Sequence, residues 1–296
     1  MKAVIMAGGK GTRLRPLTCN KPKPMVPIAN RPMMEHIVNL LRKHHFDDVM
    51  VTLFYLGESI ENYFGDGSQF GLRMRYFTEE KPLGTAGSVK NGADFLDETF
   101  LVISGDALTD IDLEAAVAFH KEKGSLATLV LTRVDNPLEY GVVITDAEGR
   151  IRRFLEKPGW GEVFSDTVNT GIYILEPEVL NYFNKGQVFD FSKDLFPLLL
   201  AKGEPMYGYV ASGYWSDIGN LEQYRQAHFD VLTGKIRVSI PGREIQPGIW
   251  VGEGVQIDAD ASLEAPILLG DYCQIESGAH IGAYTVMGNY GCVQEG

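Results

Sequence analysis

A glycine-rich loop followed by four cationic side chains lies near the start of this 296-residue chain. Residues 2–7 form a short apolar run without alternation, typical of a strand covered on both faces. It is interrupted by Gly8, Gly9 and Gly11, and the next twelve residues contain Arg13, Arg15, Lys21 and Lys23. Because glycine lacks a Cβ, backbone N–H groups there can approach an anion closely. The pattern predicts a phosphate site; a plain strand-to-helix turn with solvated charges is the alternative.

Better-known motifs do not account for this loop. A dinucleotide fingerprint would need glycine where Leu14 stands, and the Gly-Lys-Ser/Thr of a P-loop is absent. The six histidines lack ligand spacing, and no Ser/His/Asp or Cys/His set is apparent. We therefore expect no protein nucleophile. A phosphate monoester, largely dianionic at neutral pH, would itself be the attacking group, and catalysis would rest on positioning and charge neutralisation.

Two carboxylates follow predicted strands far apart in the sequence. Asp106 comes after the run at 100–105, and Asp217 lies in the segment at 214–219. Each alone could simply cap the segment that follows it. Together, beside a cationic phosphate loop, they predict a Mg²⁺ site, because that ion is usually held by one or two carboxylates together with substrate phosphate and water.

Two further polar groups stand at strand ends. Glu156 and Lys157 close one predicted strand, and Asn169 with Thr170 precedes another. A carboxylate beside a cation can be a ligand site or a surface ion pair worth about 0–1 kcal/mol. These residues are candidates for a polar substrate.

The elements that must position these side chains alternate between strand and helix. Helical stripes are predicted at 33–45, 60–64, 85–95, 113–123, 196–202 and 220–232, the last capped by Asn220. Strands are predicted between them, with a hairpin at 141–155. This order predicts a Rossmann-like α/β unit over 1–232, whose mostly parallel mixed sheet is flanked by helices and carries ligands at the carboxyl ends of its strands.

The tail has a six-residue period. Inward positions recur as pairs two residues apart, at 249/251, 255/257, 261/263, 267/269, 273/275, 279/281 and 285/287. Hexapeptide repeats of small or aliphatic residues predict a short left-handed parallel β-helix over 245–296, after a linker at 233–244. Each coil must stack on a neighbour to bury its core. We expect either a chain cut short or a tail that packs on another subunit, giving a homo-oligomer.

Composition limits the class of partner. The net charge is −12, which disfavours nucleic acid and anionic membranes, so we expect small-molecule substrates. There is no signal peptide pattern and no run of eighteen apolar residues, which predicts a soluble, cytoplasmic protein. The three cysteines are expected to be free thiols.

Six ordered motifs together resemble a known family. They span residues 7–27, 82–87, 105–106, 156–158, 169–171 and 215–219. The combination resembles the signature of sugar-nucleotide pyrophosphorylases, nucleotidyltransferases that act on hexose 1-phosphates, and the resemblance covers nearly the whole chain. It implies an enzyme that joins a nucleoside triphosphate to a hexose 1-phosphate and releases pyrophosphate, with Mg²⁺.

The resemblance also implies residue roles. Arg13, Lys23, Asp106 and Asp217 would be catalytic, and the two aspartates would hold the metal. Nucleotide binding would fall to Ala7, Gly8, Gly9, Gly11, Thr12, Arg13, Lys23, Gly84, Thr85, Ala86 and Asp106. Sugar phosphate binding would fall to Gly141, Glu156, Lys157, Asn169 and Thr170.

Within the family, the motifs at 82–87 and 169–173 look most like mannose-1-phosphate guanylyltransferases. Some of these carry a phosphomannomutase domain after the repeat, and this chain could be the N-terminal part of such a fusion. Thymidylyl- or uridylyltransferases of glucose 1-phosphate remain open, as does a non-catalytic subunit that senses nucleotide-sugar. A hexapeptide acyltransferase is disfavoured, because the coils are few and no catalytic histidine stands out.

Overall fold

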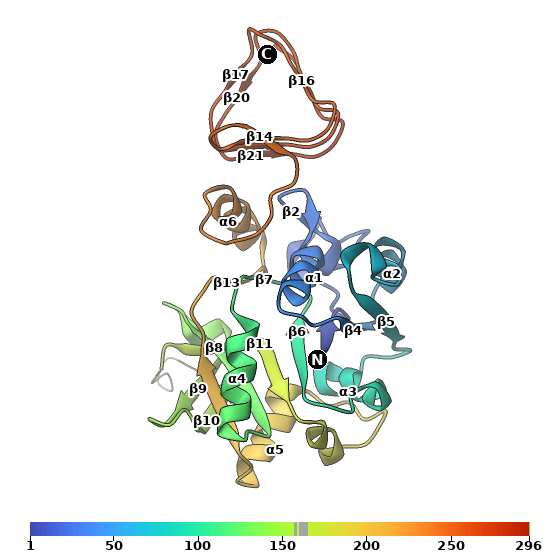
Figure 1. Ribbon diagram of the computed structural model, residues 1–296, viewed down its shortest axis with the longest axis vertical. Coiled ribbons are helices and arrows are strands. Elements are labelled where there is room, and N and C mark those ends of the chain that lie inside the picture. The colour runs from blue at the N-terminus through green and yellow to red at the C-terminus, as the bar shows by residue number, and fades with distance from the viewer. Residues whose placement is uncertain (157–158, 160–164, 296) are drawn as a thin grey trace.

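A computed structural model describes residues 1–156, 159 and 165–295 (Figure 1). Within these residues, nine strands form the central sheet, in the order β10-β9-β11-β6-β1-β4-β5 with β8 beside β11 and β12 beside β8. The strands are β1 (Lys2–Met6), β4 (Asp48–Leu53), β5 (Arg73–Thr78), β6 (Phe100–Ser104), β8 (Ala127–Arg133), β9 (Gly141–Thr145), β10 (Ile151–Glu156), β11 (Thr167–Leu175) and β12 (Met206–Val210). Pairing is parallel through β6, β1, β4 and β5 and between β8 and β12, and antiparallel around β11. The expected α/β fold with a mixed sheet is confirmed.

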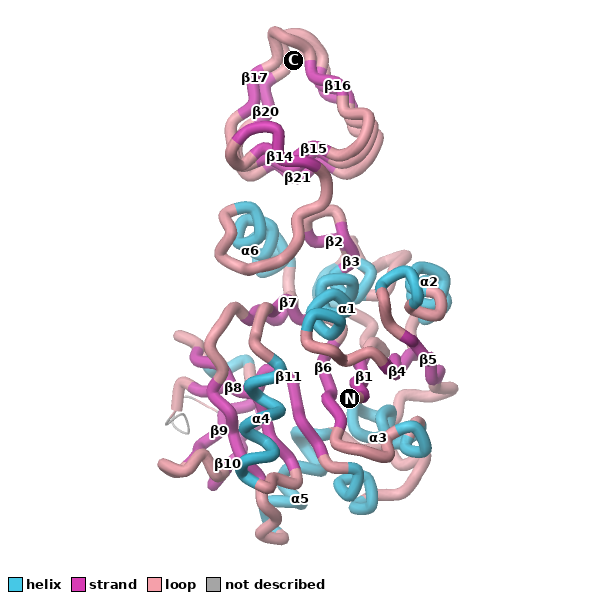
Figure 2. Tube along the Cα trace, viewed as in Figure 1, coloured by secondary structure: helices cyan, strands magenta, loops and turns pink. Residues whose placement is uncertain are grey.

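Helices cover both faces of this sheet (Figure 2). They are α1 (Met33–Lys43), α2 (Gly57–Phe64), α3 (Gly84–Asn91), α4 (Leu113–Lys123), α5 (Phe196–Ala201) and α6 (Leu221–Leu232). The predicted helices match these within a few residues. Asn220 caps α6 as expected, since its Oδ1 accepts from the N–H of Gln223 at 2.9 Å.

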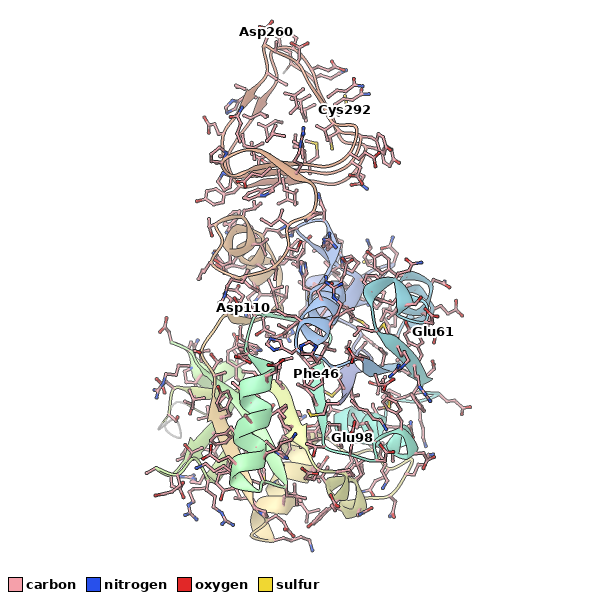
Figure 3. The ribbon with its side chains drawn as sticks, viewed as in Figure 1. Phe46, Glu61, Glu98, Asp110, Asp260 and Cys292 are labelled. Carbon is pink, nitrogen blue, oxygen red and sulfur yellow. The ribbon has the colours of Figure 1, made fainter. Side chains whose placement is uncertain are left out.

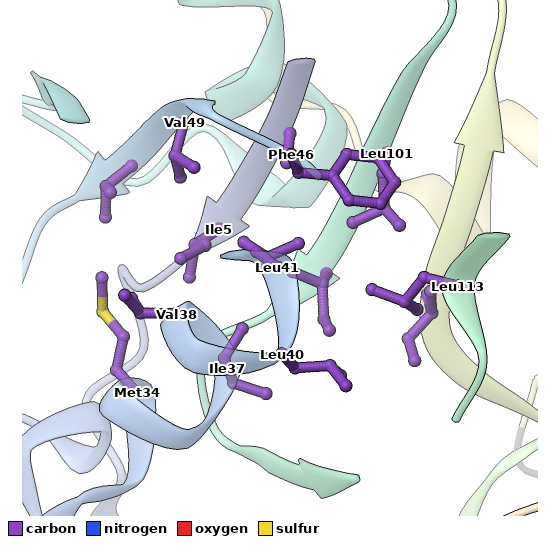
Figure 4. Close-up of a cluster of buried hydrophobic side chains, with 14 of the residues drawn as sticks. Ile5, Met34, Ile37, Val38, Leu40, Leu41, Phe46, Val49, Leu101 and Leu113 are labelled. Carbon is purple, nitrogen blue, oxygen red and sulfur yellow. The ribbon is translucent and has the colours of Figure 1, made fainter. Parts of the chain in front are cut away.

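The apolar residues of β1 are divided between two cores. Ala3 and Ile5 pack with α1, α2 and α4 on one face, whereas Val4 packs with α3 and α5 on the other. Figure 4 shows Ile5 among side chains of α1 on the first face. All three are fully buried. The uninterrupted apolar run in the sequence therefore follows from a strand covered on both sides.

The tail stacks its strands every eighteen residues. Parallel ladders join β15 (Ile249–Val251), β18 (Ile267–Leu269) and β21 (Thr285–Met287), then β16 (Gln256–Ile257), β19 (Gln274–Ile275) and β22 (Cys292–Val293), and then β17 (Ser262–Leu263) and β20 (His280–Ile281). Three hexapeptides make one turn of a triangular outline, and β14 (Arg243–Gln246) pairs antiparallel with β15 (Figure 1). We call residues 243–293 the strand stack.

One side of the strand stack packs on the α/β unit. The central residues of its three-residue strands, Trp250, Leu268 and Val286, point outward and join an apolar cluster with Met33 and Ala227. On the other sides the equivalent outward positions are polar, as at Gln256, Gln274 and His280. An apolar column at an eighteen-residue interval thus marks the docking side.

Leu268→Ala should destabilise the protein by about 2–5 kcal/mol, because Leu268 is only 1% exposed and truncation leaves a cavity at this junction. Gln274→Ala, at the equivalent exposed position of the next side, should change stability by no more than about 0.5 kcal/mol. Urea unfolding of both variants measures this. If Leu268→Ala lowered the free energy of unfolding no more than Gln274→Ala, the contact between the strand stack and the α/β unit would not stabilise the fold.

Candidate functional site

The glycine loop follows β1 and packs against Lys23. Ala7 is buried, and its N–H donates to the carbonyl of Thr52 at 3.0 Å, so this amide belongs to the sheet rather than to the loop. Gly11 has φ +59, and a Cβ there would lie 2.8 Å from the Cβ of Lys23. A left-handed backbone this close to a neighbour requires glycine.

Gly9 is a glycine for a different reason. Among the described residues, a Cβ at Gly9 would meet no atom beyond its chain neighbours within 4 Å and would project into open space. Gly9 lines two adjoining cavities, so a side chain there would narrow the space between them.

Lys23 lies between the two predicted carboxylates. Its Nζ donates to Asp106 Oδ2 at 2.7 Å and to Asp217 Oδ1 at 3.3 Å, and the lysine is 6% exposed. The 111-residue separation of the aspartates is closed by two short antiparallel strands, β7 (Ala107–Thr109) and β13 (Trp215–Asp217). Since Asp217 pairs with Ala107 in this ladder, it lies beside Asp106.

The charges of this cluster stabilise one another. Burial alone would lower the pKa of the Lys23 ammonium, but Asp106 and Asp217 outweigh it and hold that pKa above its ordinary value. Desolvation alone would raise the pKa of Asp106. The attraction of Lys23 and a hydrogen bond from Ser104 hold it below its usual range instead.

Three adjoining cavities surround Asp106. The first, of about 320 Å³, is lined by Gly8, Gly9, Gly84, Thr85 and Asp106 among others. The second, of about 380 Å³, is lined by Arg13, Lys23, Asp106, Gly141, Glu156, Asn169, Thr170 and Asp217 among others. The third, of about 170 Å³, is lined by Gly9, Gly11, Thr12, Arg13, Lys23 and Asp106 among others. The structure thus brings most of the predicted site residues to one place.

Some predicted residues lie elsewhere or use their side chains differently. Ala7 and Ala86 are buried outside the cavity walls. The Thr170 hydroxyl donates to the carbonyl of Val130 at 2.7 Å, so it serves the sheet. Lys157 lies outside the described residues.

Gly141 and Glu156 form one wall of the second cavity. They are register partners in the β9–β10 hairpin, and a Cβ on Gly141 would lie 2.9 Å from Glu156 Oε2. Glycine at 141 therefore allows the carboxylate to approach the strand. Asn169 also lines this cavity, and its Oδ1 accepts from the N–H of Gly171 at 3.0 Å, at an irregularity in the β11 register.

Sequence reasoning missed two carboxylates of the first cavity. Glu79 follows β5, and its buried Oε1 has no hydrogen-bond partner in the described part of the chain. Asp190 accepts from the Thr85 hydroxyl at 2.8 Å. A signal for Glu79 was available, since it stands at the carboxyl end of a predicted strand as Asp106 does.

The residues present fit a divalent cation. Among the described residues no group of three or more His, Cys, Asp or Glu side chains is arranged for a metal. Two carboxylates nevertheless converge on one cationic centre, where the Lys23 ammonium stands. Two carboxylates are what Mg²⁺ needs from a protein when substrate phosphates complete its shell.

Comparisons with known proteins agree with this arrangement. A family model described as nucleotidyl transferase matches residues 2–234. The chain is 45% identical to a UTP–glucose-1-phosphate uridylyltransferase of Synechocystis, with 91% of this chain and 74% of that protein covered. It is 39% identical to a mannose-1-phosphate guanylyltransferase of Mycobacterium tuberculosis, covering 78% of this chain and 65% of that one. The chain thus spans less than two thirds of that guanylyltransferase.

Solved structures show the same fold. A putative glucose-1-phosphate thymidylyltransferase from Bacillus anthracis superposes with a TM-score of 0.72 at 26% identity, over 81% of this chain and 97% of that chain. HddC from Yersinia pseudotuberculosis, complexed with GMP-PN, gives a TM-score of 0.67 at 26% identity, over 78% and 99%. The chain belongs to the nucleotidyl transferase family and, within it, to the sugar-nucleotide pyrophosphorylases. None of its described helices is long and apolar enough to cross a bilayer.

The depressed pKa of Asp106 predicts an acid-dependent stability. A carboxyl whose folded pKa is below the unfolded value of about 3.9 stabilises the fold above about pH 5, and this contribution is lost as pH falls through the folded pKa. Lys23→Met removes the cation that lowers this pKa. The loss of stability between pH 7 and pH 3 should therefore be smaller in Lys23→Met than in wild type.

Urea midpoints at the two pH values measure this difference. Lys121→Met, which removes an exposed lysine of α4, should behave as wild type does. If the loss of stability between pH 7 and pH 3 were as large in Lys23→Met as in wild type and in Lys121→Met, the coupling between Lys23 and Asp106 would be contradicted.

Proposed function

We propose that this protein joins a nucleoside triphosphate to a hexose 1-phosphate, giving a nucleoside diphosphate-sugar and pyrophosphate. The observation that carries the proposal is the Lys23 ammonium between Asp106 and Asp217, where three adjoining cavities meet. The first cavity would hold the nucleoside, the third the phosphates of the nucleotide, and the second the sugar phosphate.

The chemistry needs no base from the protein. A phosphate oxygen of the sugar phosphate attacks the α-phosphorus, the bond from that phosphorus to the bridging oxygen breaks, and pyrophosphate leaves. Lys23 would neutralise charge at the α-phosphate, and Arg13, which lines the second and third cavities, would neutralise the leaving pyrophosphate. Gly9 and Gly11 would let backbone N–H groups face the phosphates. The dianionic sugar phosphate is already deprotonated at neutral pH.

We assign the cofactor as Mg²⁺, with Asp106 and Asp217 as its protein ligands. When bound, the ion would supply neutralisation of phosphate charge and would fix the orientation of the substrates.

GTP is the proposed nucleotide, and Glu79 supports it. A carboxylate is an acceptor only, and the buried Oε1 of Glu79 receives no hydrogen bond from any residue that the structure describes. Guanine presents two adjacent donors, N1–H and the N2 amino group, whereas uracil and thymine offer one N–H between two carbonyls. Because Glu79 lines the first cavity, its carboxylate would complement guanine better than uracil or thymine. With GTP we propose mannose 1-phosphate, as in the guanylyltransferase relatives.

UTP with glucose 1-phosphate is the second candidate. It is favoured by the 45% identity to the uridylyltransferase, which extends over 91% of this chain. A third candidate is a non-catalytic subunit that senses nucleotide-sugar.

We also propose that the strand stack is a left-handed parallel β-helix, that the α/β unit ends near residue 232, and that copies of the chain assemble through the stack. A cytoplasmic location stays a prediction.

A pyrophosphate-release assay should give the highest kcat/KM with GTP and mannose 1-phosphate when GTP, UTP, dTTP, ATP and CTP are crossed with mannose 1-phosphate and glucose 1-phosphate. EDTA should abolish release, and added Mg²⁺ should restore it. A maximum for UTP and glucose 1-phosphate would select the second candidate. If no pair of substrates gave pyrophosphate release, the non-catalytic subunit that senses nucleotide-sugar would be the remaining candidate.

Glu79→Gln should lower the ratio of kcat/KM for GTP to that for UTP by about 10–100-fold, because the amide replaces an acceptor by a donor. Glu80→Gln is the matched control, since Glu80 is exposed and lies outside the first cavity. An unchanged ratio in Glu79→Gln would remove Glu79 from base selection.

A further inference from the structure

A cationic cavity lies on the other end of the β7/β13 ladder from the candidate active site. It has a volume of about 240 Å³ and is bounded by the second half of α1, the end of β7 and residues 237–239. We call it the α1–β7 cavity. Asp110, labelled in Figure 3, stands beside it and fixes one wall, because its Oδ2 accepts from the N–H of Arg237 at 2.9 Å.

Three cationic residues line this cavity. They are Arg42 and Lys43 from α1 and Arg237 from the segment after α6. Arg237 Nε lies 3.5 Å from Asp110 Oδ2, whereas neither Arg42 nor Lys43 has a carboxylate within ion-pair distance in the described part of the chain. This local excess of positive charge stands in a protein whose net charge is −12.

Helix electrostatics explain only part of the cluster. Arg42 and Lys43 stand in the last turn of α1, where cations complement the negative end of the helix dipole. That reason does not apply to Arg237, which is 194 positions beyond Lys43 in the sequence. The cavity also exposes Asn39 and Ser239, whose side chains have no hydrogen-bond partner among the described residues. Charges and hydrogen-bond donors from two segments around a small hollow suit a compact oxyanion.

Both walls of the cavity connect to Lys23 and its carboxylates. Thr109 lines the cavity and lies three residues along β7 from Asp106, about 10 Å at the rise of a strand. Its register partner in the ladder is Trp215, two residues before Asp217. The other wall, α1, begins at Met33, whose N–H donates to the carbonyl of Val26 at 3.0 Å, just after the turn that carries Lys23.

We propose that the α1–β7 cavity binds a small phosphate-bearing anion and that its occupation alters catalysis through the β7/β13 ladder. The binding site is independent of the proposed function; the effect on catalysis rests on it. The volume suits inorganic phosphate or a small phosphorylated metabolite.

Calorimetric titration with inorganic phosphate at constant ionic strength tests the binding. Wild type should bind phosphate at one site more than the double variant Arg42→Ala/Lys43→Ala. In that variant the affinity of the α1–β7 cavity for phosphate should fall by about 100-fold, because hydrogen bonds from charged groups are lost. Phosphate entering the active site is common to both proteins. Lys121→Ala/Lys185→Ala, which removes two exposed lysines elsewhere, should match wild type.

Identical isotherms in all three proteins would overturn the site. So would equal competition by chloride, which would reduce the effect to screening. Crystals soaked in phosphate should show the anion between Arg42, Lys43 and Arg237. If the anion appeared there while the isotherms of the three proteins did not differ, it would be an adventitious ion only, and the proposed site would be overturned.

The effect on catalysis is measured separately. With both substrates saturating, phosphate should change kcat more than about twofold in wild type and in the Lys121/Lys185 control, and should leave the Arg42/Lys43 variant unchanged. An unchanged kcat in wild type overturns the coupling. If the protein released no pyrophosphate with any substrate pair, the proposed function would fail while the isotherms still decided the binding site.

Discussion

The arrangement of this protein depends on one buried cation. Lys23 is 6% exposed, and an ammonium removed from water is stable only beside opposite charge. Asp106 and Asp217 provide that charge at 2.7 Å and 3.3 Å. Loss of either carboxylate would leave Lys23 undercompensated, and loss of Lys23 would leave two carboxylates facing each other. The three residues must therefore be positioned together, although they lie on three different segments of the chain.

Each segment is held by a different part of the fold. Asp106 follows β6 in the middle of the sheet, and the short β7/β13 ladder brings Asp217 beside it. The turn that carries Lys23 leads into the hairpin of β2 (Pro27–Ile28) and β3 (Arg31–Pro32). The strand stack contacts this hairpin, because Asn30 Nδ2 donates to the carbonyl of Met287 at 2.7 Å. The tail, which stands apart from the central sheet in Figure 1, thus supports the segment after Lys23.

Periodic patterns and polar residues at strand ends could be predicted from the sequence. Contacts between irregular segments could not. The apolar run at 2–7 predicted β1, the six-residue period predicted the stacking interval, and strand ends predicted Asp106 and Asp217. The ion pairs of Lys23 were not foreseen, since they depend on the antiparallel ladder. Asp190 was missed because it lies in a segment without periodicity. Thr170 was predicted to bind the sugar phosphate, and its contact with the sheet was not foreseen: beside a register irregularity in β11, its hydroxyl donates to the carbonyl of Val130.

Charge balance gives the reason for paired carboxylates in a site for anions. Arg13 and Lys23 bring two positive charges to the cavities, and Asp106 and Asp217 cancel them. Glu156 also lines the second cavity, so a triphosphate and a dianionic sugar phosphate would meet a site without excess positive charge in a protein of net charge −12. The carboxylates would repel the substrates unless a divalent cation screened them, and with that cation they would become its anchor. The same residues that stabilise Lys23 in the free protein therefore suit the proposed Mg²⁺, and the Lys23 ammonium would then be available to neutralise charge at the α-phosphate.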